Sequence, residues 1–231
     1  MIHLICNWKQ GPHNASHANQ LMTLAKNSGV QVTICPPNWY LSAVQRYTGD
    51  KLSLGLQDAV VIQTSKNTGS AELSSLLPFE PKYCIVGHSE TRAELGLTER
   101  DIQQKCVGLL AKNIVSIVCI GYIYPEKSEA ESLQIQLKTI RTTSTIVAFE
   151  PLSAIGTGVI GDIKILKTHY DTIKRSVGET AILCYGGSVD ATNIEALHRE
   201  LSINTFLIGS ASIDVQKFSE LLVIASRIDK A

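Results

Sequence analysis

The strongest constraint on the fold is a regular alternation of short apolar runs with segments of helical periodicity. Runs that are apolar almost throughout are typical of strands buried on both faces. Eight such runs occur, at residues 2–6, 30–35, 52–56, 83–87, 114–121, 145–149, 181–185 and 205–209. Helical spacing of apolar residues occurs between most of them, at 16–27, 98–112, 125–142 and 163–177, and Thr98 and Asp101 have the spacing of a capping box.

This alternation predicts a parallel sheet, because each helix returns the chain to the same end of the next strand. Eight is also the number of strands that closes a (β/α)8 barrel. An open, doubly wound α/β sheet is the alternative. With no long linker or low-complexity tract along the 231 residues, we expect a single barrel domain that covers 1–231.

Composition excludes several classes of function. The 21 Lys and Arg side chains are balanced by 21 Asp and Glu, without a basic block, so neither nucleic acid nor an anionic membrane is an expected partner. No apolar run is long enough to span a bilayer, and the first residues lead directly into a strand-like segment, which favours a cytoplasmic protein. The six cysteines form no CxxC pair, so we expect buried thiols without a disulfide or a metal site.

The polar residues that directly follow the predicted strands are the candidates for catalysis. In a parallel barrel the carboxyl ends of all strands meet at one face, so residues distant in sequence share that mouth. An amide, a cation, an imidazole and a carboxylate follow strands in this way, at Asn7, Lys9, His88 and Glu150. Each one taken alone has an ordinary structural reading, but together they are suited to proton abstraction next to a carbonyl group.

Two turns rich in small residues follow the last two strands, at 186–188 (GGS) and 209–212 (GSAS). Their backbone N–H groups can approach an anion closely, and the loops after strands 7 and 8 are the usual phosphate site of such barrels. A single turn of this kind is weak evidence, because it is also an ordinary connection from a strand to a helix. The pair predicts a phosphorylated substrate.

Four motifs resemble the signatures of the triosephosphate isomerase family in order and approximate spacing: CNWK (6–9), VGHSETR (86–92), AFEPLSAIGTG (148–158) and YGGSV (185–189). The resemblance implies a TIM barrel that interconverts dihydroxyacetone phosphate and D-glyceraldehyde 3-phosphate through an enediol(ate), in glycolysis and gluconeogenesis. It also implies a homodimer that needs neither a metal nor a cofactor.

The resemblance assigns a role to each matching residue. Glu150 would be the base, His88 the neutral electrophile, Lys9 the positive charge and Asn7 a hydrogen-bond donor. The phosphate would be held by backbone N–H groups, and a lid would begin at Pro151 and fold over it. The implied phosphate ligands are Gly156, Ser188, Gly209 and Ser210; the implied lid residues after Pro151 are Ala154, Ile155, Gly156, Thr157 and Gly158; and the residues implied to support the site from behind are Ser89, Glu90 and Tyr185.

The sequence departs from the family pattern in three places. Tyr122, Phe149 and Ser153 stand where the family usually has Glu, Tyr and Trp, so we expect altered hinge energetics of the lid. At the expected interface, Asn67, Ser70 and Thr91 replace an aromatic residue, Glu and Arg, so we expect a weak dimer in which the Thr68-Gly69 loop reaches the neighbouring subunit. Ser210 replaces a glycine, and phosphate affinity would fall if its backbone needed a positive φ.

Two alternatives to this function remain open from the residues themselves. One is another phosphate-handling barrel enzyme, such as a sugar-phosphate isomerase for a substrate of different length. The other is a catalytically idle barrel that serves as a phosphate-binding or interaction module, which the altered lid would favour.

Overall fold

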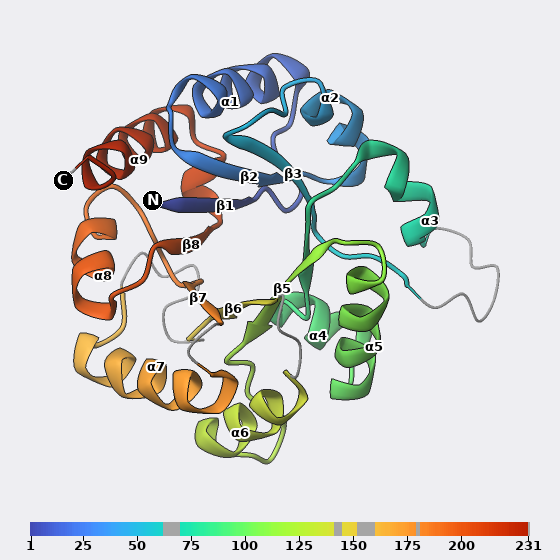
Figure 1. Cartoon of the computed structure of the whole chain (residues 1–231), viewed down its shortest axis with the longest axis vertical. Coiled ribbons are helices and arrows are strands. Elements are labelled where there is room, and N and C mark those ends of the chain that lie inside the picture. Colours follow the sequence, from blue (N-terminus) through green and yellow to red (C-terminus); the bar gives the residue numbers. More distant parts are fainter. Residues whose placement is uncertain (62–69, 141–144, 152–159, 179–180, 231) are drawn as a thin grey trace.

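The eight apolar segments form eight parallel strands that close into a barrel in chain order (Figure 1). The computed structural model describes residues 1–61, 70–140, 145–151, 160–178 and 181–230. Closure is complete because β1 pairs with both β2 and β8, so the predicted barrel is confirmed and the open sheet is excluded. The strands are β1 (His3–Asn7), β2 (Gln31–Cys35), β3 (Leu52–Leu56), β4 (Tyr83–Val86), β5 (Val115–Ile120), β6 (Thr145–Phe149), β7 (Ile182–Tyr185) and β8 (Thr205–Ile208).

Helices form a ring outside the strands (Figure 1). The α-helices are α1 (Ala15–Asn27), α2 (Leu41–Gln45), α3 (Leu73–Leu76), α4 (Ser89–Leu95), α5 (Glu99–Leu110), α6 (Glu129–Thr139), α7 (Ile163–Val177), α8 (Ile194–Leu201) and α9 (Val215–Ile228). In the described part of the chain, short 3-10 helices accompany them at η1 (Asn38–Tyr40), η2 (Leu77–Phe79) and η4 (Ser210–Ser212). Within the described ranges no helix is both long and apolar enough to cross a bilayer.

Helix starts follow local capping chemistry. Thr98 and Asp101 form the predicted capping box at α5, with the Thr98 N–H donating to the Asp101 carboxylate at 2.8 Å. The predicted helix start at residue 125 is wrong, because α6 begins at Glu129. A second capping box made by Ser128 and Glu131 sets that start, and Glu126 just before it has a positive φ of 62°.

The strands separate two apolar regions. Side chains that point inward fill the barrel, and those that point outward pack under the helices, as alternation along a strand requires. All six cysteines are buried and free, as expected, and burial raises the pKa of the Cys35 and Cys84 thiols well above the ordinary value. The inward-facing set is Ile5, Cys35, Ile85, Ile117, Cys119, Ile146, Ala148, Cys184 and Leu207.

A polar cluster lies toward the starts of β1, β2 and β4, at the end of the barrel opposite the mouth. His3 is buried, its Nε2 lies 2.8 Å from the Thr33 hydroxyl, and its ring centroid lies 5.3 Å from that of Tyr83. Burial lowers the pKa of His3 to about 4, so the ring is neutral in the folded protein at neutral pH. These contacts are those of a structural residue.

Candidate active site

The predicted residues meet in a hollow of about 470 Å³ at the carboxyl ends of the strands. The strands end there on one face, so residues from opposite ends of the chain line the same space. The lining combines the four predicted reacting residues with both small-residue turns. It comprises Asn7, Lys9, His88, Glu150, Gly186, Gly187, Ser188, Val189, Asp190, Leu207, Gly209, Ser210, Ala211, Ile213 and Lys217.

Glu150 comes directly after β6 and is 2% exposed. Its N–H donates to the Ile120 carbonyl at 2.8 Å, which continues the pairing of β6 with β5 by one residue. Oε1 lies 3.2 Å from Nε2 of His88, and Oε2 accepts the Ser89 N–H at 3.4 Å. Burial raises the pKa of Glu150, and the nearby His88, Ser89 N–H and Lys9 oppose this only in part. A carboxylate placed in this way is a stronger base than one in water.

His88 is the N-cap residue of α4. The Glu90 N–H donates to its Nδ1 at 3.3 Å, so Nδ1 carries no proton in this arrangement and the ring is neutral. The proton is then on Nε2, which faces Oε1 of Glu150. The positive end of the helix dipole also disfavours an imidazolium at this position. His88 can therefore donate one hydrogen bond into the hollow.

Lys9 has an unusual backbone, with a positive φ of 48°. Its N–H donates to the Asn7 side-chain oxygen at 3.1 Å, and its carbonyl accepts from Nε2 of Gln57 at 2.8 Å. Gln57 also donates to the Cys35 carbonyl at 3.0 Å, so one amide joins the ends of β1 and β2. The Lys9 ammonium lies 2.5 Å from Oε1 of Glu90, a half-exposed pair that contributes little to stability. Sequence reasoning did not single out Gln57.

The glycines of the turn after β7 have a specific steric role. A Cβ at Gly186 would lie 2.8 Å from Cγ of Glu150, and one at Gly187 would lie 2.3 Å from the Tyr185 hydroxyl oxygen. These glycines therefore make room for the carboxylate and for a buried tyrosine, and the Gly186 N–H itself donates to the Phe149 carbonyl at 2.8 Å. Tyr185 is fully buried behind them.

The turn after β8 shows whether Ser210, which replaces a glycine of the family pattern, needs a positive φ. Ser210 begins the 3-10 helix η4, and it is not among the described non-glycine residues with a positive φ. The substitution of serine for glycine therefore introduces no left-handed strain at this position. Ser210 lines the hollow.

Several predicted residues lie outside the described part of the chain. They are the lid residues Ala154, Ile155, Gly156, Thr157 and Gly158, together with Ser153 and the expected interface residues Asn67, Thr68 and Gly69. Pro151 is described and buried. Phe149 packs edge-on against His169 and Tyr170, with ring centroids 5.1 Å and 5.9 Å away, and Tyr122 packs edge-on against Tyr124.

Two further residues near the site were missed by sequence reasoning. Arg92 is 2% exposed and joins the ends of β4 and β5, donating to the Gly87 carbonyl at 2.7 Å and to the Cys119 carbonyl at 3.1 Å. Its charge is balanced by Glu99 at 2.5 Å. The sequence signal that could have identified Arg92 is its position four residues after His88, which is one helical turn along α4. Lys217, in the first turn of α9, adds a cation to the hollow and had no sequence signal.

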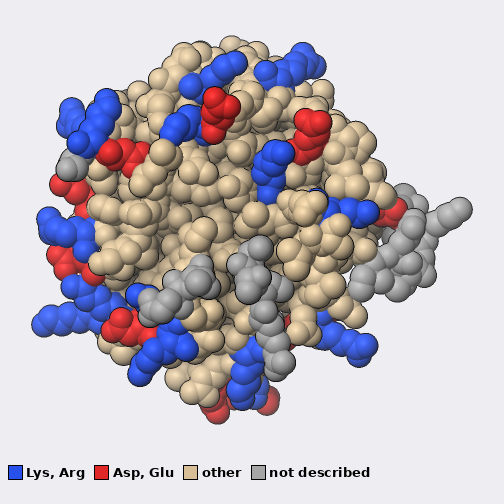
Figure 2. Space-filling model, in the orientation of Figure 1, with Lys and Arg blue, Asp and Glu red and all other residues tan. Residues whose placement is uncertain are grey.

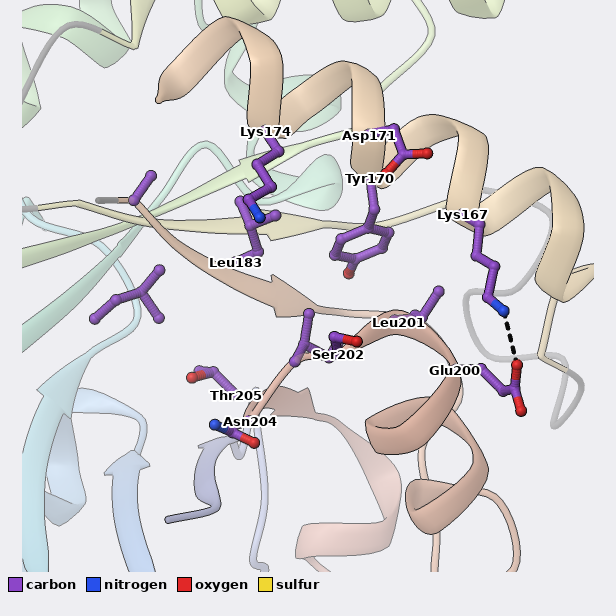
Figure 3. Close-up of a pocket in the computed structure, with 13 residues that line it drawn as sticks. Lys167, Tyr170, Asp171, Lys174, Leu183, Glu200, Leu201, Ser202, Asn204 and Thr205 are labelled. Atoms are coloured by element: carbon purple, nitrogen blue, oxygen red, sulfur yellow. Dashed lines mark hydrogen bonds and ion pairs between the residues drawn. The ribbon is translucent and has the colours of Figure 1, made fainter. Parts of the chain in front are cut away.

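A second hollow, of about 510 Å³, lies at the starts of β7 and β8, beside α7 (Figure 3). Lys167 pairs there with Glu200 at 2.7 Å, and the Tyr170 hydroxyl donates to the Cys184 carbonyl at 2.9 Å. Among the residues that the structure describes, its lining includes none of those predicted for catalysis. We therefore place the candidate active site at the other end of the strands.

Charged side chains are mixed in sign on the face drawn in Figure 2. Lys and Arg lie beside Asp and Glu around its periphery, and most of the centre is uncharged. No group of His, Cys, Asp and Glu suited to a metal ion occurs within the described ranges. The charged side chains that line the hollow are Lys9 and Lys217, together with Glu150 and Asp190.

A closed parallel barrel with a buried carboxylate, a neutral imidazole and a lysine beside glycine-rich turns defines a class of barrel enzymes. These enzymes move a proton next to the carbonyl of a phosphorylated substrate. Comparison with known proteins identifies the family within this class. The profile of the triosephosphate isomerase family matches residues 2–225, and the chain belongs to this family.

Its relatives match it over nearly the whole chain. Triosephosphate isomerase of Mesomycoplasma hyorhinis is 30% identical over 237 residues, covering 96% of this chain and 97% of that protein. The enzyme of Rhodopirellula baltica is 30% identical over 243 residues, covering 95% of both chains. The enzyme of Mycoplasma genitalium is 29% identical over 237 residues, covering 95% and 96%.

Family membership confirms the resemblance predicted from the four motifs. The protein is an aldose–ketose isomerase, and it interconverts dihydroxyacetone phosphate and D-glyceraldehyde 3-phosphate, a step of glycolysis. Another phosphate-handling barrel of different substrate length is thereby set aside.

Proposed function

We propose that Glu150, His88, Lys9 and Asn7 carry out this isomerisation. The observation that carries the proposal is the 3.2 Å approach of Oε1 of the buried Glu150 to Nε2 of His88, inside the hollow that both phosphate turns line. A carboxylate base and a neutral histidine are the established pattern of this family, so the contribution here is their assignment to residues of this chain.

The chemistry follows from what each side chain offers. Glu150 takes a proton from the carbon next to the carbonyl, and the C–H electron pair moves into the new carbon–carbon double bond of the enediolate. Nε2–H of His88 donates to the carbonyl oxygen as negative charge develops on it, and the amide of Asn7 donates from the same side. His88 completes proton transfer to this oxygen and takes the hydroxyl proton from the oxygen on the neighbouring carbon. Glu150 then returns its proton to the first carbonyl carbon, and the electron pair left on the second oxygen forms the new carbonyl bond. Substrate entry requires the contact between His88 and Glu150 to open, because each group then faces the substrate.

The phosphate is held by the backbone N–H groups of Ser188, Gly209, Ser210 and Gly156, with Lys9 as the nearby charge. Support for the first three is their position on the hollow, and support for Gly156 is the family motif. The pair between Lys9 and Glu90 is half exposed, so a dianion can compete for the ammonium at small cost. Ser89, Glu90 and Tyr185 support the site from behind.

The lid would begin at Pro151, which stiffens the chain after the catalytic residue, and would include residues 154–158. Closing it over the phosphate excludes water and strengthens each fixed dipole. Phe149 lacks the hydroxyl of the usual tyrosine and packs against His169 and Tyr170. We therefore expect the hinge energetics of the lid to differ from those of relatives that have Glu, Tyr and Trp where this chain has Tyr122, Phe149 and Ser153.

The chain is proposed to act as one barrel domain of residues 1–231, in the cytoplasm, as a homodimer joined through the Thr68-Gly69 loop and without a metal or cofactor. The support is the resemblance of the family motifs, together with the balanced charge of the chain. Ser70 and Thr91 stand where relatives usually carry a charged pair, which favours a weaker interface than usual.

The direct test is a coupled assay on glyceraldehyde 3-phosphate with the wild type and Glu150→Gln. Losing a general base is expected to lower kcat by about 10²–10⁴-fold or more. Glu94→Gln, an exposed change on α4 with the same loss of charge, should leave kcat unchanged. If Glu150→Gln keeps wild-type activity, the proposed base is wrong. If the folded wild type is inert, the idle phosphate-binding barrel replaces this proposal.

A further inference from the structure

Helix α6 sends one fully buried amide, that of Gln136, into the connection that follows β5. Its Oε1 accepts the Gly121 N–H at 2.9 Å, and its Nε2 donates to the Tyr122 carbonyl at 2.5 Å. Both polar ends of one side chain are thus used on the backbone of two adjacent residues. Few side chains can accept and donate at once with this geometry.

Gly121 is in direct contact with the backbone of the catalytic base. Its φ is +109°, and a Cβ at this position would lie 2.4 Å from the Glu150 carbonyl oxygen and 2.9 Å from the Glu150 carbonyl carbon. The preceding residue, Ile120, accepts the Glu150 N–H at 2.8 Å. The backbone of Glu150 is therefore located by residues 120 and 121, and residue 121 is located by Gln136.

The carboxylate depends on this backbone support because its polar partners are few: the Ser89 N–H, the His88 ring and the Cys119 thiol. Oε2 accepts from Ser89 at 3.4 Å, and Oε1 lies 3.2 Å from His88. Cγ is confined on one side by Gly186. The Ser89 contact is long and holds the carboxylate weakly, so the direction of the carboxylate depends on the position of its main chain.

We propose that Gln136 is a positioning residue for the isomerisation. It holds Gly121 against Glu150 and so keeps the carboxylate aimed at the carbon from which it takes the proton. This inference rests on the proposed role of Glu150 as the base. A misplacement of about 1 Å at a reacting group can lower a rate by about 10²-fold.

The first variant is Gln136→Met, which keeps the length of the side chain and removes both hydrogen bonds. We expect kcat to fall about 10- to 100-fold. KM should change less than about twofold, because the turns that hold the phosphate are not touched. The acid limb of the pH profile of kcat/KM should also move, because the surroundings of the Glu150 carboxylate change.

The matched control is Ser132→Ala on the same helix. Ser132 is 1% exposed, and its hydroxyl accepts the Tyr124 N–H at 3.0 Å, so it anchors the same connection at a residue farther from Glu150. We expect this variant to lower the temperature of thermal unfolding while kcat stays within about twofold of the wild type. Equal losses of kcat in Ser132→Ala and Gln136→Met would show a general structural effect and would overturn the proposal.

A second variant keeps the test decisive if Gln136→Met does not fold. In Gln136→Glu a protonated carboxyl group can accept from Gly121 and donate to Tyr122, but an ionised one cannot donate. We expect near-normal kcat at acid pH and a loss of kcat, relative to wild type, as the carboxyl ionises. A kcat ratio to wild type that does not vary with pH would contradict the proposal.

The inference and the proposed function can fail separately. If Glu150→Gln is inactive and Gln136→Met has normal kcat, Glu150 is the base and only the positioning role is wrong. If Glu150→Gln is fully active, the proposed base itself is wrong. The double variant should be no less active than Glu150→Gln alone, because Gln136 acts through Glu150.

Discussion

At position 150, the buried carboxylate that is proposed to act in catalysis lowers the stability of the folded protein. Burial raises the pKa of Glu150, so between its ordinary value and the raised value the folded state binds a proton that the unfolded state has released. Stability therefore falls as pH rises through this range, and the loss persists at neutral pH. The proposed role of Glu150 as the base accounts for a buried carboxylate that lowers stability, and other interactions of the barrel offset this cost.

We predict that Glu150→Gln raises the temperature of thermal unfolding at pH 7 while it abolishes activity. A neutral amide of the same shape avoids the cost of burying the charge. The gain should shrink when unfolding is measured at pH 4, where the wild-type carboxyl group is protonated. A variant less stable than wild type at pH 7 would show that the contacts with His88 and Ser89 outweigh the burial of the charge.

At the scale of elements, the starts of β1, β2 and β4 meet at His3, Thr33 and Tyr83. The unfolded chain protonates His3 near its ordinary pKa of about 6.5, whereas the folded protein does so only near 4. Between these values the unfolded state binds more protons, so stability falls as pH decreases. Acid should therefore loosen the barrel at this end of the strands.

We predict that the wild type loses about 3 kcal/mol of unfolding free energy between pH 6.5 and 4 through His3 alone, since each pH unit contributes about 1.4 kcal/mol. His3→Gln should remove most of this pH dependence in urea unfolding measured at several pH values. His13→Gln, an exposed substitution, serves as the control and should leave the slope unchanged. If the unfolding free energy of His3→Gln depends on pH as steeply as that of the wild type, another group is responsible for the acid sensitivity.

The helices could be predicted from the sequence where capping residues and apolar spacing define their bounds. The segments 98–112 and 163–177 correspond to α5 and α7, because capping residues and apolar spacing act within a few residues. The start of α6 was misplaced because Ser128 and Glu131 begin the helix after a turn with a left-handed Glu126. Periodicity alone does not report such a turn.

At the scale of the whole molecule, the assembly is the property most open to measurement. Loss of the usual charged pair at Ser70 and Thr91 predicts a homodimer that dissociates on dilution. Mass measured by light scattering should fall toward 25.1 kDa over a hundredfold dilution from micromolar concentration. A mass that stays at twice this value would contradict a weak interface, and one that stays at 25.1 kDa throughout would contradict the dimer.

The sequence by itself determined the barrel and its family, and it supplied the proposed reacting residues. Alternation of apolar strands with helices is a local pattern, and Asn7, Lys9, His88 and Glu150 each follow a strand directly, so the parallel topology alone brings them to one mouth. Only the tertiary structure decided how these groups are held. The contacts of Gln57, Gln136 and Gly186 join residues far apart along the chain, and such contacts have no local spacing or periodicity from which they could be predicted.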